Sequence, residues 1–134
     1  MSSPAEDIAT VVKAACSAVM SPDAAYAPGE VVRLVAKPLR YAEVTAERRT
    51  GTENRLDPGP DMGFWIVMVE AVADTENNAR TLLADASAAL DYRQLAVGGK
   101  ATSPLIFQEG RAVAFDGVQR SSRYPGGVAL HFTL

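Results

Sequence analysis

The chain has few residues of the types that form catalytic or metal-binding sites. Its 134 residues include one Cys, Cys16, and one His, His131. Cys16 lies on the apolar side of a helical pattern with no cation nearby in the sequence, which favours packing over a reactive thiolate. His131 lies in an alternating strand pattern without a nucleophile motif such as G-x-S-x-G. One His and one Cys also leave few ways to coordinate a metal. We predict a protein that is not an enzyme and that uses no cofactor or metal.

Lys100 lies in a sequence that resembles a phosphate-binding loop only in part. It follows two glycines, but the motif also requires Gly at the position of Gln94 and Ser or Thr at that of Ala101. We therefore interpret residues 92–103 as a flexible linker.

Carboxylate pairs occur at two places, Asp57 with Asp61 and Glu43 with Glu47. The first pair lies in the Gly- and Pro-rich residues 50–63, which would not hold a rigid acid–base geometry. The second pair points from the wet side of a predicted strand, so we interpret both pairs as solvated surface. The basic residues near the second pair lack interleaved aromatic side chains, which argues against a platform for single-stranded nucleic acid. They are Arg33, Lys37, Arg40, Arg48 and Arg49.

Composition and charge restrict the classes of protein to which this chain could belong. This length suits one domain with one core, and 48% hydrophobic and 22% charged residues are ordinary for a globular protein. The net charge of −3 gives no long-range attraction to nucleic acid or anionic lipid. We find no basic signal-peptide segment, and the longest apolar run, 64–69, is shorter than the ~20 residues of a membrane span. We expect a single domain over 1–134, with a long mobile loop at 50–63 and no membrane partner.

The first predicted element is a helix. Ser3 and Glu6 form a capping box around Pro4, and Pro22 ends the helix because it cannot continue the hydrogen-bond ladder. Apolar residues recur between them at three- and four-residue spacing. They are Ile8, Val11, Val12, Ala15, Cys16 and Val19.

Three predicted strands come next. After a loop at 24–30, residues 31–36 are rich in β-branched side chains, and residues 39–49 alternate between apolar and polar side chains. Residues 63–73 are apolar in both alternating sets, which is typical of a central strand covered on both faces.

A second helix follows, with Asp74 or Thr75 as its N-cap. Glu76 and Arg80 are spaced to form an ion pair on its outer side. Its apolar stripe consists of Ala79, Leu82, Leu83, Ala86 and Leu90.

The C-terminal part reads as three strands, at 105–108, 111–115 and 128–134. Glu109-Gly110 is a plausible hairpin turn, and Asp116-Gly117 a second turn. The element order is α-β-β-β-α-β-β-β, which predicts an α+β fold with a mainly antiparallel sheet and two helices on one face. Two helices of ~24 Å cover about one face of a small sheet. Because the central strand is apolar on both faces, we expect another subunit to cover the second face.

Three segments of the chain resemble the tail-terminator proteins of long-tailed bacteriophages, and the likeness covers essentially the whole chain. The segments are an N-terminal helix, SPAEDIATVVKAACSAV, a strand running into a helix, GFWIVMVEAVADTENNARTLLADASAAL, and a closing strand, RYPGGVALHFTL. The resemblance implies a small α+β subunit of a homohexameric ring. Such a ring caps the tail tube, stops its polymerisation and presents the head-joining surface.

The resemblance also implies partners and a location. The partners would be further copies of the chain, the tail tube protein and head–tail connector proteins. Genome DNA would pass through an acidic lumen without specific binding. The protein would reside in the virion tail or neck, and in the host cytoplasm during assembly. By its position, the 50–63 segment would order against tube subunits. The candidate interface residues are Arg48, Arg49, Glu53, Arg55, Asp57, Asp61 and Trp65.

An alternative is a small-molecule-binding or catalytic α+β domain that dimerises through its sheet. Such a domain requires an apolar pocket with converging polar groups. The plausible lining residues are Tyr41, Trp65 and His131.

Overall fold

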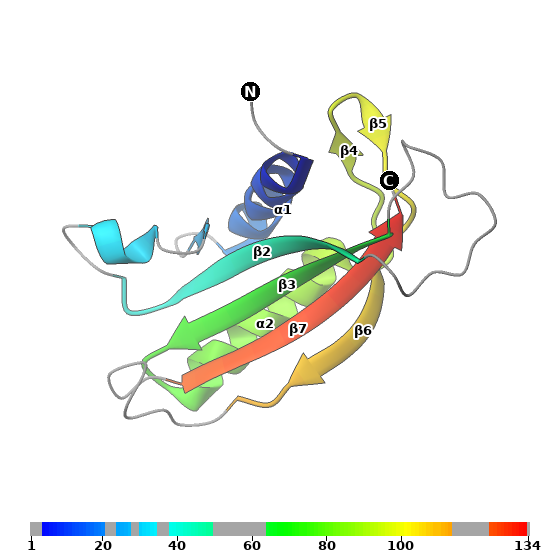
Figure 1. The fold of residues 1–134 in the computed structure, drawn as a ribbon. Coiled ribbons are helices and arrows are strands. Elements are labelled where there is room, and N and C mark those ends of the chain that lie inside the picture. Colours follow the sequence, from blue (N-terminus) through cyan, green and yellow to red (C-terminus); the bar gives the residue numbers. More distant parts are fainter. Residues whose placement is uncertain are drawn as a thin grey trace.

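The computed structural model of the protein consists of a five-stranded sheet with two helices on one face and a small two-stranded sheet beside it (Figure 1). The structure describes residues 4–20, 24–27, 30–34, 38–49, 64–113 and 124–133. Strand order in the main sheet is β1-β2-β3-β7-β6, with β1 parallel to β2 and every other pair antiparallel. The predicted α+β class and mainly antiparallel sheet are therefore confirmed.

The elements have the following bounds: α1 Pro4–Met20, β1 Ala25–Tyr26, the 3₁₀ helix η1 Val31–Arg33, β2 Tyr41–Arg49, β3 Phe64–Ala73, α2 Glu76–Leu90, β4 Ala96–Val97, β5 Lys100–Ala101, β6 Ile106–Arg111 and β7 Tyr124–Thr133.

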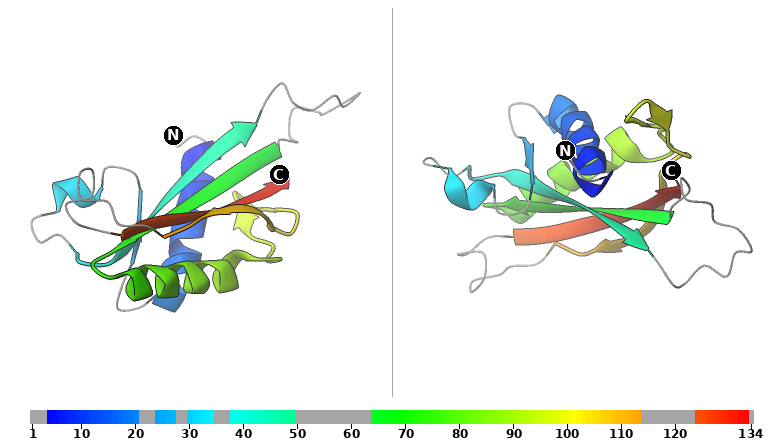
Figure 2. Two further views of the ribbon diagram at one scale, coloured as in Figure 1. Left: turned by 90° about the horizontal axis from the view of Figure 1, so that it is seen from below. Right: turned by 45° about the horizontal axis from the view of Figure 1, so that its top comes forward.

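The main core lies between the sheet and the two helices (Figure 2). Helix α1 packs against β1, β2 and α2, and α2 packs chiefly against β3 and β7. Strand β3 is central, as its doubly apolar pattern predicts. The core side chains follow the helical and strand periods. They include Ile8, Val12, Cys16 and Met20 of α1, Ala79, Leu82, Ala86 and Leu90 of α2, and Val44, Val67, Val69, Leu130 and Phe132 of the sheet.

The start of α2 agrees with the sequence pattern. Thr75 is the N-cap, and its hydroxyl accepts a hydrogen bond from the Asn78 backbone N–H at 3.2 Å. Glu76 and Arg80 form the predicted ion pair. In α1, by contrast, Val19 is 49% exposed, and Met20 takes the last core position in its place.

The predicted strand at 31–36 is wrong, because residues 31–33 form η1 and Leu34 lies outside any strand. Glu30 explains the difference. Its carboxylate accepts hydrogen bonds from Lys13 Nζ at 2.8 Å and from the Ala27 N–H at 2.6 Å, which fixes a turn immediately before η1. These tertiary contacts override the β-propensity of the segment.

The predicted loop at 24–30 also contains structure that the sequence did not indicate. Residues 25–26 form β1, which lies parallel to the first residues of β2. The backbone N–H of Ala25 donates to the Ser17 hydroxyl at 3.0 Å, which holds β1 against α1.

The predicted linker at 92–103 folds into the β4–β5 hairpin. Gly98 and Gly99 form its turn with φ of +58° and +84°, and two successive positive φ values match the turn that suits a two-residue hairpin. The glycines therefore serve a turn and not a phosphate site. Thr102 is buried, and its hydroxyl accepts from the Leu95 N–H at 3.0 Å, which ties the hairpin base together.

The predicted turn at Glu109-Gly110 is wrong, since β6 continues through both residues. The register against β7 shifts between Phe107 and Glu109, so a β-bulge absorbs one extra residue. Strand β6 ends at Arg111, and residues 112 and 113 belong to no strand. The separate strand predicted at 111–115 is therefore not present in its described residues, 111–113.

Strand β7 begins earlier than predicted and runs through two glycines. At Gly126, an added Cβ would lie 2.6 Å from Val113 Cγ2 and 3.1 Å from Leu83 Cδ1. The absence of a side chain therefore allows α2 and the segment after β6 to pack closely on the strand.

Several predicted features lie outside the described residues. They are the Ser3 cap, the helix stop at Pro22, the 50–63 loop and the Asp116-Gly117 turn. Within the described part of the chain, no helix is long and apolar enough to cross a membrane.

Candidate functional site

The sheet has one face that neither helix covers. Because successive side chains of a strand point to opposite faces, this face is set by the residues that alternate with the core positions. We call it the helix-free face. Its members are Glu43, Thr45 and Glu47 of β2, Ile66, Met68 and Glu70 of β3, Ala129 and His131 of β7, and Ile106 of β6.

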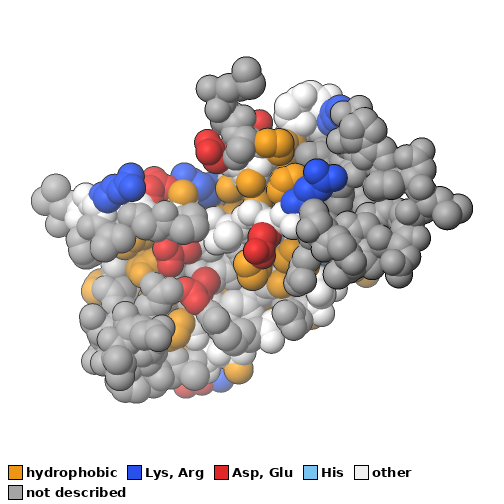
Figure 3. All heavy atoms as spheres, viewed as in Figure 1, with side chains coloured by type: hydrophobic (Ala, Val, Ile, Leu, Met, Phe, Trp, Pro, Cys, Tyr) orange, Lys and Arg blue, Asp and Glu red, His pale blue; other side chains and the backbone are white. Residues whose placement is uncertain are grey.

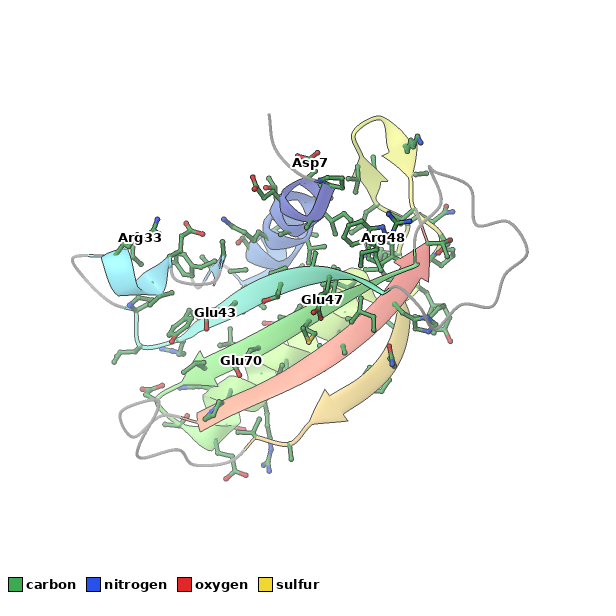
Figure 4. The ribbon with its side chains drawn as sticks, viewed as in Figure 1. Asp7, Arg33, Glu43, Glu47, Arg48 and Glu70 are labelled. Carbon is green, nitrogen blue, oxygen red and sulfur yellow. The ribbon has the colours of Figure 1, made fainter. Side chains whose placement is uncertain are left out.

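Three glutamates give the helix-free face its charge. Glu43 and Glu70 are direct cross-strand partners, and Glu47 lies opposite Ile66. Figure 4 places the three residues on β2 and β3, and Figure 3 shows acidic side chains over these strands. Like charges placed directly opposite each other destabilise a sheet. The helix-free face therefore carries a concentration of negative charge.

Apolar side chains lie between the glutamates. Ile66 and Ala129 are 3% and 8% exposed, whereas Met68 is 39% exposed. His131 is half-buried, with Ile66 and Ile106 as its cross-strand neighbours. The face is thus a mixed surface with acidic groups around a partly exposed apolar centre.

Beyond Glu43 and Glu70, the helix-free face continues to Tyr41 and Val72, and there other parts of the chain cover it. Val72 is fully buried there against Val31 of η1 and Tyr41, and Tyr26 of β1 packs at the edge of this small cluster. The Tyr26 and Tyr41 rings meet edge to face, with centroids 6.3 Å apart. Packing against η1 and β1 therefore explains why β3 is apolar on the helix-free face at Val72. For the rest of this face, cover by another subunit stays a prediction.

The seven candidate interface residues do not form one surface among the described residues. Two lie at the end of β2, one lies in the main core, and four lie outside the described residues. Arg48 is exposed and lies opposite Trp65 in the β2–β3 register, and Arg49 ends the strand. Trp65 is 8% exposed and belongs to the main core. The other four lie outside the described residues and are Glu53, Arg55, Asp57 and Asp61. An interface role for all seven stays a prediction.

The residues that could line a ligand pocket do not meet. Tyr41 and His131 share the helix-free face, but their β3 partners, Val72 and Ile66, are six residues apart, or ~20 Å along the strand. Trp65 points to the opposite face, into the main core. The described residues contain no group of three His, Cys, Asp or Glu side chains that could hold a metal ion.

Cys16 has the environment of a packing residue. It is fully buried in α1, and burial raises the pKa of its thiol to about 11. The thiol is therefore neutral at physiological pH and is not an activated nucleophile.

The pairing of Glu43 with Glu70 is the feature that sequence reasoning missed. Glu70 is the one charged residue within the apolar run of β3, and that isolation was a signal. Which residue lies opposite Glu70 depends on the β2–β3 register. The sequence does not determine that register, because fourteen residues, 50–63, separate the two strands and no short turn fixes their alignment.

Two solved structures share this fold over nearly the whole chain. One, which carries no functional description, aligns with a TM-score of 0.62 and 10% identity, covering 96% of this chain and 90% of that chain. The other belongs to the virion of a native gene transfer agent particle. It aligns with a TM-score of 0.59 and 12% identity, covering 96% of this chain and 93% of that chain.

No family model and no curated protein matches the sequence. At these identities the structural likeness concerns the fold alone. The chain therefore shares its fold with a component of a virus-like particle.

Proposed function

We propose that the protein is a structural subunit of a phage-like virion, and specifically a tail terminator. In this role it forms a ring, a homohexamer, that caps the tail tube, stops its polymerisation and provides the surface that joins the head. The observation that carries the proposal is the shared fold with a chain of a gene transfer agent virion over 96% of this sequence. The protein acts in the virion tail or neck after assembly in the host cytoplasm.

The charge of the helix-free face supports a channel function. In the proposed ring, Glu43, Glu47 and Glu70 face the lumen, where they repel the phosphates of passing DNA. This part of the face is then open to the lumen, in place of the cover by another subunit that the sequence pattern predicts. Tight DNA binding depends on cations that displace the counterions of the phosphates, and acidic groups do the opposite. A genome could then move through the ring without adhering to it.

We propose that residues 50–63, together with Arg48 and Arg49 at the adjoining end of β2, form the surface that binds the tail tube. Their neighbours in the particle would be the tail tube protein on one side and connector proteins on the other. The alternative of a ligand-binding or catalytic domain has no comparable support, because Tyr41, Trp65 and His131 do not converge on one pocket.

The decisive experiment is assembly of tail tubes with and without the protein, followed by electron microscopy. We expect tubes of uniform length with a ring at one end when the protein is present, and longer tubes of variable length without it. Deleting residues 52–61 should keep the fold, checked by circular dichroism, and weaken capping. Equal tube-length distributions with and without the intact protein would overturn the proposal.

A further inference from the structure

The backbone is strained just after the end of α2. Tyr92 has a φ of +60° and is the one non-glycine residue with a positive φ in the part of the chain that the structure describes. At a helix end this left-handed conformation is usually adopted by glycine or asparagine. Here a distant segment holds it: the Tyr92 N–H donates to the Leu105 carbonyl at 2.7 Å, and the Leu105 N–H donates to the Arg93 carbonyl at 2.9 Å. These bonds fix the position from which the Tyr92 ring projects.

The Tyr92 side chain packs little against its own subunit. It is 72% exposed, more than any other large hydrophobic side chain that the structure describes, and it belongs to neither hydrophobic cluster. Arg93 is exposed beside it, and its guanidinium forms no ion pair with a described residue. Tyr and Arg are the residue types enriched at the energetic centres of protein interfaces. A ring on a fixed backbone also loses little conformational entropy when a partner buries it.

This pair lies at the same end of the sheet as the proposed tube-binding surface. Through β3, Arg49 at the end of β2 shares its register position with Thr133 of β7. Thr133 exchanges two hydrogen bonds with Ser103, at 3.0 and 2.8 Å, and Leu105, two residues later, bonds to Tyr92. Figure 1 shows the β4–β5 hairpin, which lies between Tyr92 and Ser103 in the chain, beside this end of β7.

The segment around the pair is cationic, although the chain as a whole is acidic. Residues 92–108 contain Arg93 and Lys100 and no carboxylate, whereas the net charge of the chain is −3. A guanidinium pairs with a carboxylate through two parallel hydrogen bonds, which gives the contact a defined direction. The chemistry of this segment therefore suits an acidic partner.

A protein fits this end of the sheet better than a nucleic acid. Asp91 immediately precedes Tyr92, and the first turn of α1, which contacts β4, carries Glu6 and Asp7. Binding of single-stranded nucleic acid uses a continuous cationic groove with several stacking aromatic rings. These carboxylates interrupt such a groove, and Tyr92 is a single ring.

We propose that Tyr92 and Arg93 anchor a docking contact with a different protein, which offers a carboxylate to Arg93 beside an apolar patch for the Tyr92 ring. The identity of this partner rests on the proposed function, which makes it the tail tube protein. The contact then adds a fixed anchor to the surface formed by residues 50–63, Arg48 and Arg49.

The first test compares variants by the protein concentration needed to cap tail tubes, measured from tube lengths by electron microscopy. Tyr92→Asn removes the ring, and Arg93→Glu reverses the charge. Each should raise the required concentration by at least about tenfold, whereas Tyr92→Phe should stay within about threefold of wild type. The matched controls are Leu39→Asn, at a 60% exposed residue beside the opposite end of β2, and Arg33→Glu on η1. Both controls should cap like wild type.

Thermal unfolding separates docking from a structural role of Tyr92. Asparagine adopts the left-handed conformation with less strain, so Tyr92→Asn should unfold at the wild-type temperature or a few degrees above it. Weaker capping by a variant of equal or higher stability supports the docking contact. A loss of stability that accompanies the loss of capping would show instead that the ring supports the fold, and would overturn the proposal.

Photochemical cross-linking tests the partner without relying on the capping assay. A benzophenone amino acid replaces Tyr92 in the full-length protein, which is expressed in its native host and irradiated. We expect an adduct with a different protein whose cross-linked peptide, identified by mass spectrometry, contains Asp or Glu beside apolar residues. The same amino acid at Leu39 is the control. No adduct above this control, or an adduct with nucleic acid, with a second copy of the chain or with a peptide lacking carboxylates, would overturn the inference.

The two proposals fail in different ways. If wild type caps tubes and the Tyr92→Asn and Arg93→Glu variants cap equally well, only the docking anchor is contradicted. If wild type does not cap tubes, the terminator function is contradicted, and the cross-linked peptide at position 92 still decides whether this end of the sheet binds an acidic protein.

Discussion

Glu43 of β2 and Glu70 of β3 are direct cross-strand partners on the helix-free face. Opposed like charges are unusual in a sheet because they oppose the pairing of the strands that carry them. Their pairing concentrates negative charge on the helix-free face of the sheet.

A double-mutant cycle measures this repulsion directly. Glu43→Gln, Glu70→Gln and the double variant should give a repulsive interaction of ~0.2–1 kcal/mol in the free energy of unfolding, measured in urea. High salt should reduce it because these side chains are partly exposed. The control cycle pairs Glu43 with Glu47, four residues along the same strand, and should give a smaller value. An attractive interaction between Glu43 and Glu70 would contradict the prediction.

Neutralising the helix-free face tests its role in the proposed channel. Particles that carry the triple variant Glu43→Gln, Glu47→Gln and Glu70→Gln should assemble but release DNA more slowly, because the lumen repels phosphates less. The control variant, Glu6→Gln, Glu76→Gln and Asp85→Asn, changes net charge equally on the helices. It should release DNA at the wild-type rate, and equal slowing by both variants would count against a special role for this face.

The buried Cys16 thiol should make stability fall at alkaline pH. Its pKa is about 11 in the folded chain against 9.0 for a free thiol. The unfolded state therefore loses its proton first. The stability contribution of the thiol is complete below pH 9 and is lost as pH rises towards 11, by up to about 2–3 kcal/mol.

Urea unfolding of wild type and Cys16→Ala between pH 7 and 11 checks this effect. The variant should be about 1 kcal/mol less stable at pH 7, owing to the lost packing, and the difference should shrink or reverse above pH 9. Ellman's reagent should react slowly with the folded wild type at pH 8 and quickly after unfolding. A constant stability difference across the pH range would show that burial does not control this thiol.

Gly126 should be intolerant of any side chain. Gly126→Ala places a Cβ 2.6 Å from Val113 Cγ2 and should destabilise the protein by about 1–3 kcal/mol through overpacking. Gly110→Ala is the matched control, since its Cβ would lie 3.5 Å from the nearest atom, Phe107 Cζ. Thermal unfolding should therefore show a clear loss for the first variant and a small change for the second.

The sequence alone identified the elements whose side-chain pattern repeats over many residues. Both helices, the central strand (predicted at 63–73 and observed at 64–73) and the α+β class follow from regular burial of one side or both sides of an element. The order of residue types records that burial directly. The Thr75 cap and the Glu76–Arg80 pair were also predictable, because both depend on contacts within one or two turns of α2.

Only the tertiary structure decided the features that depend on distant partners. Residues 31–33 form a 3₁₀ helix because Glu30 bonds to Lys13, seventeen residues earlier. Residues 109–110 remain in β6 because β7 offers a continuing partner. The Glu43–Glu70 pairing likewise depends on which strands lie side by side and in which register. A local pattern cannot specify these features, because the hydrogen bonds and contacts that fix them join segments far apart in the chain.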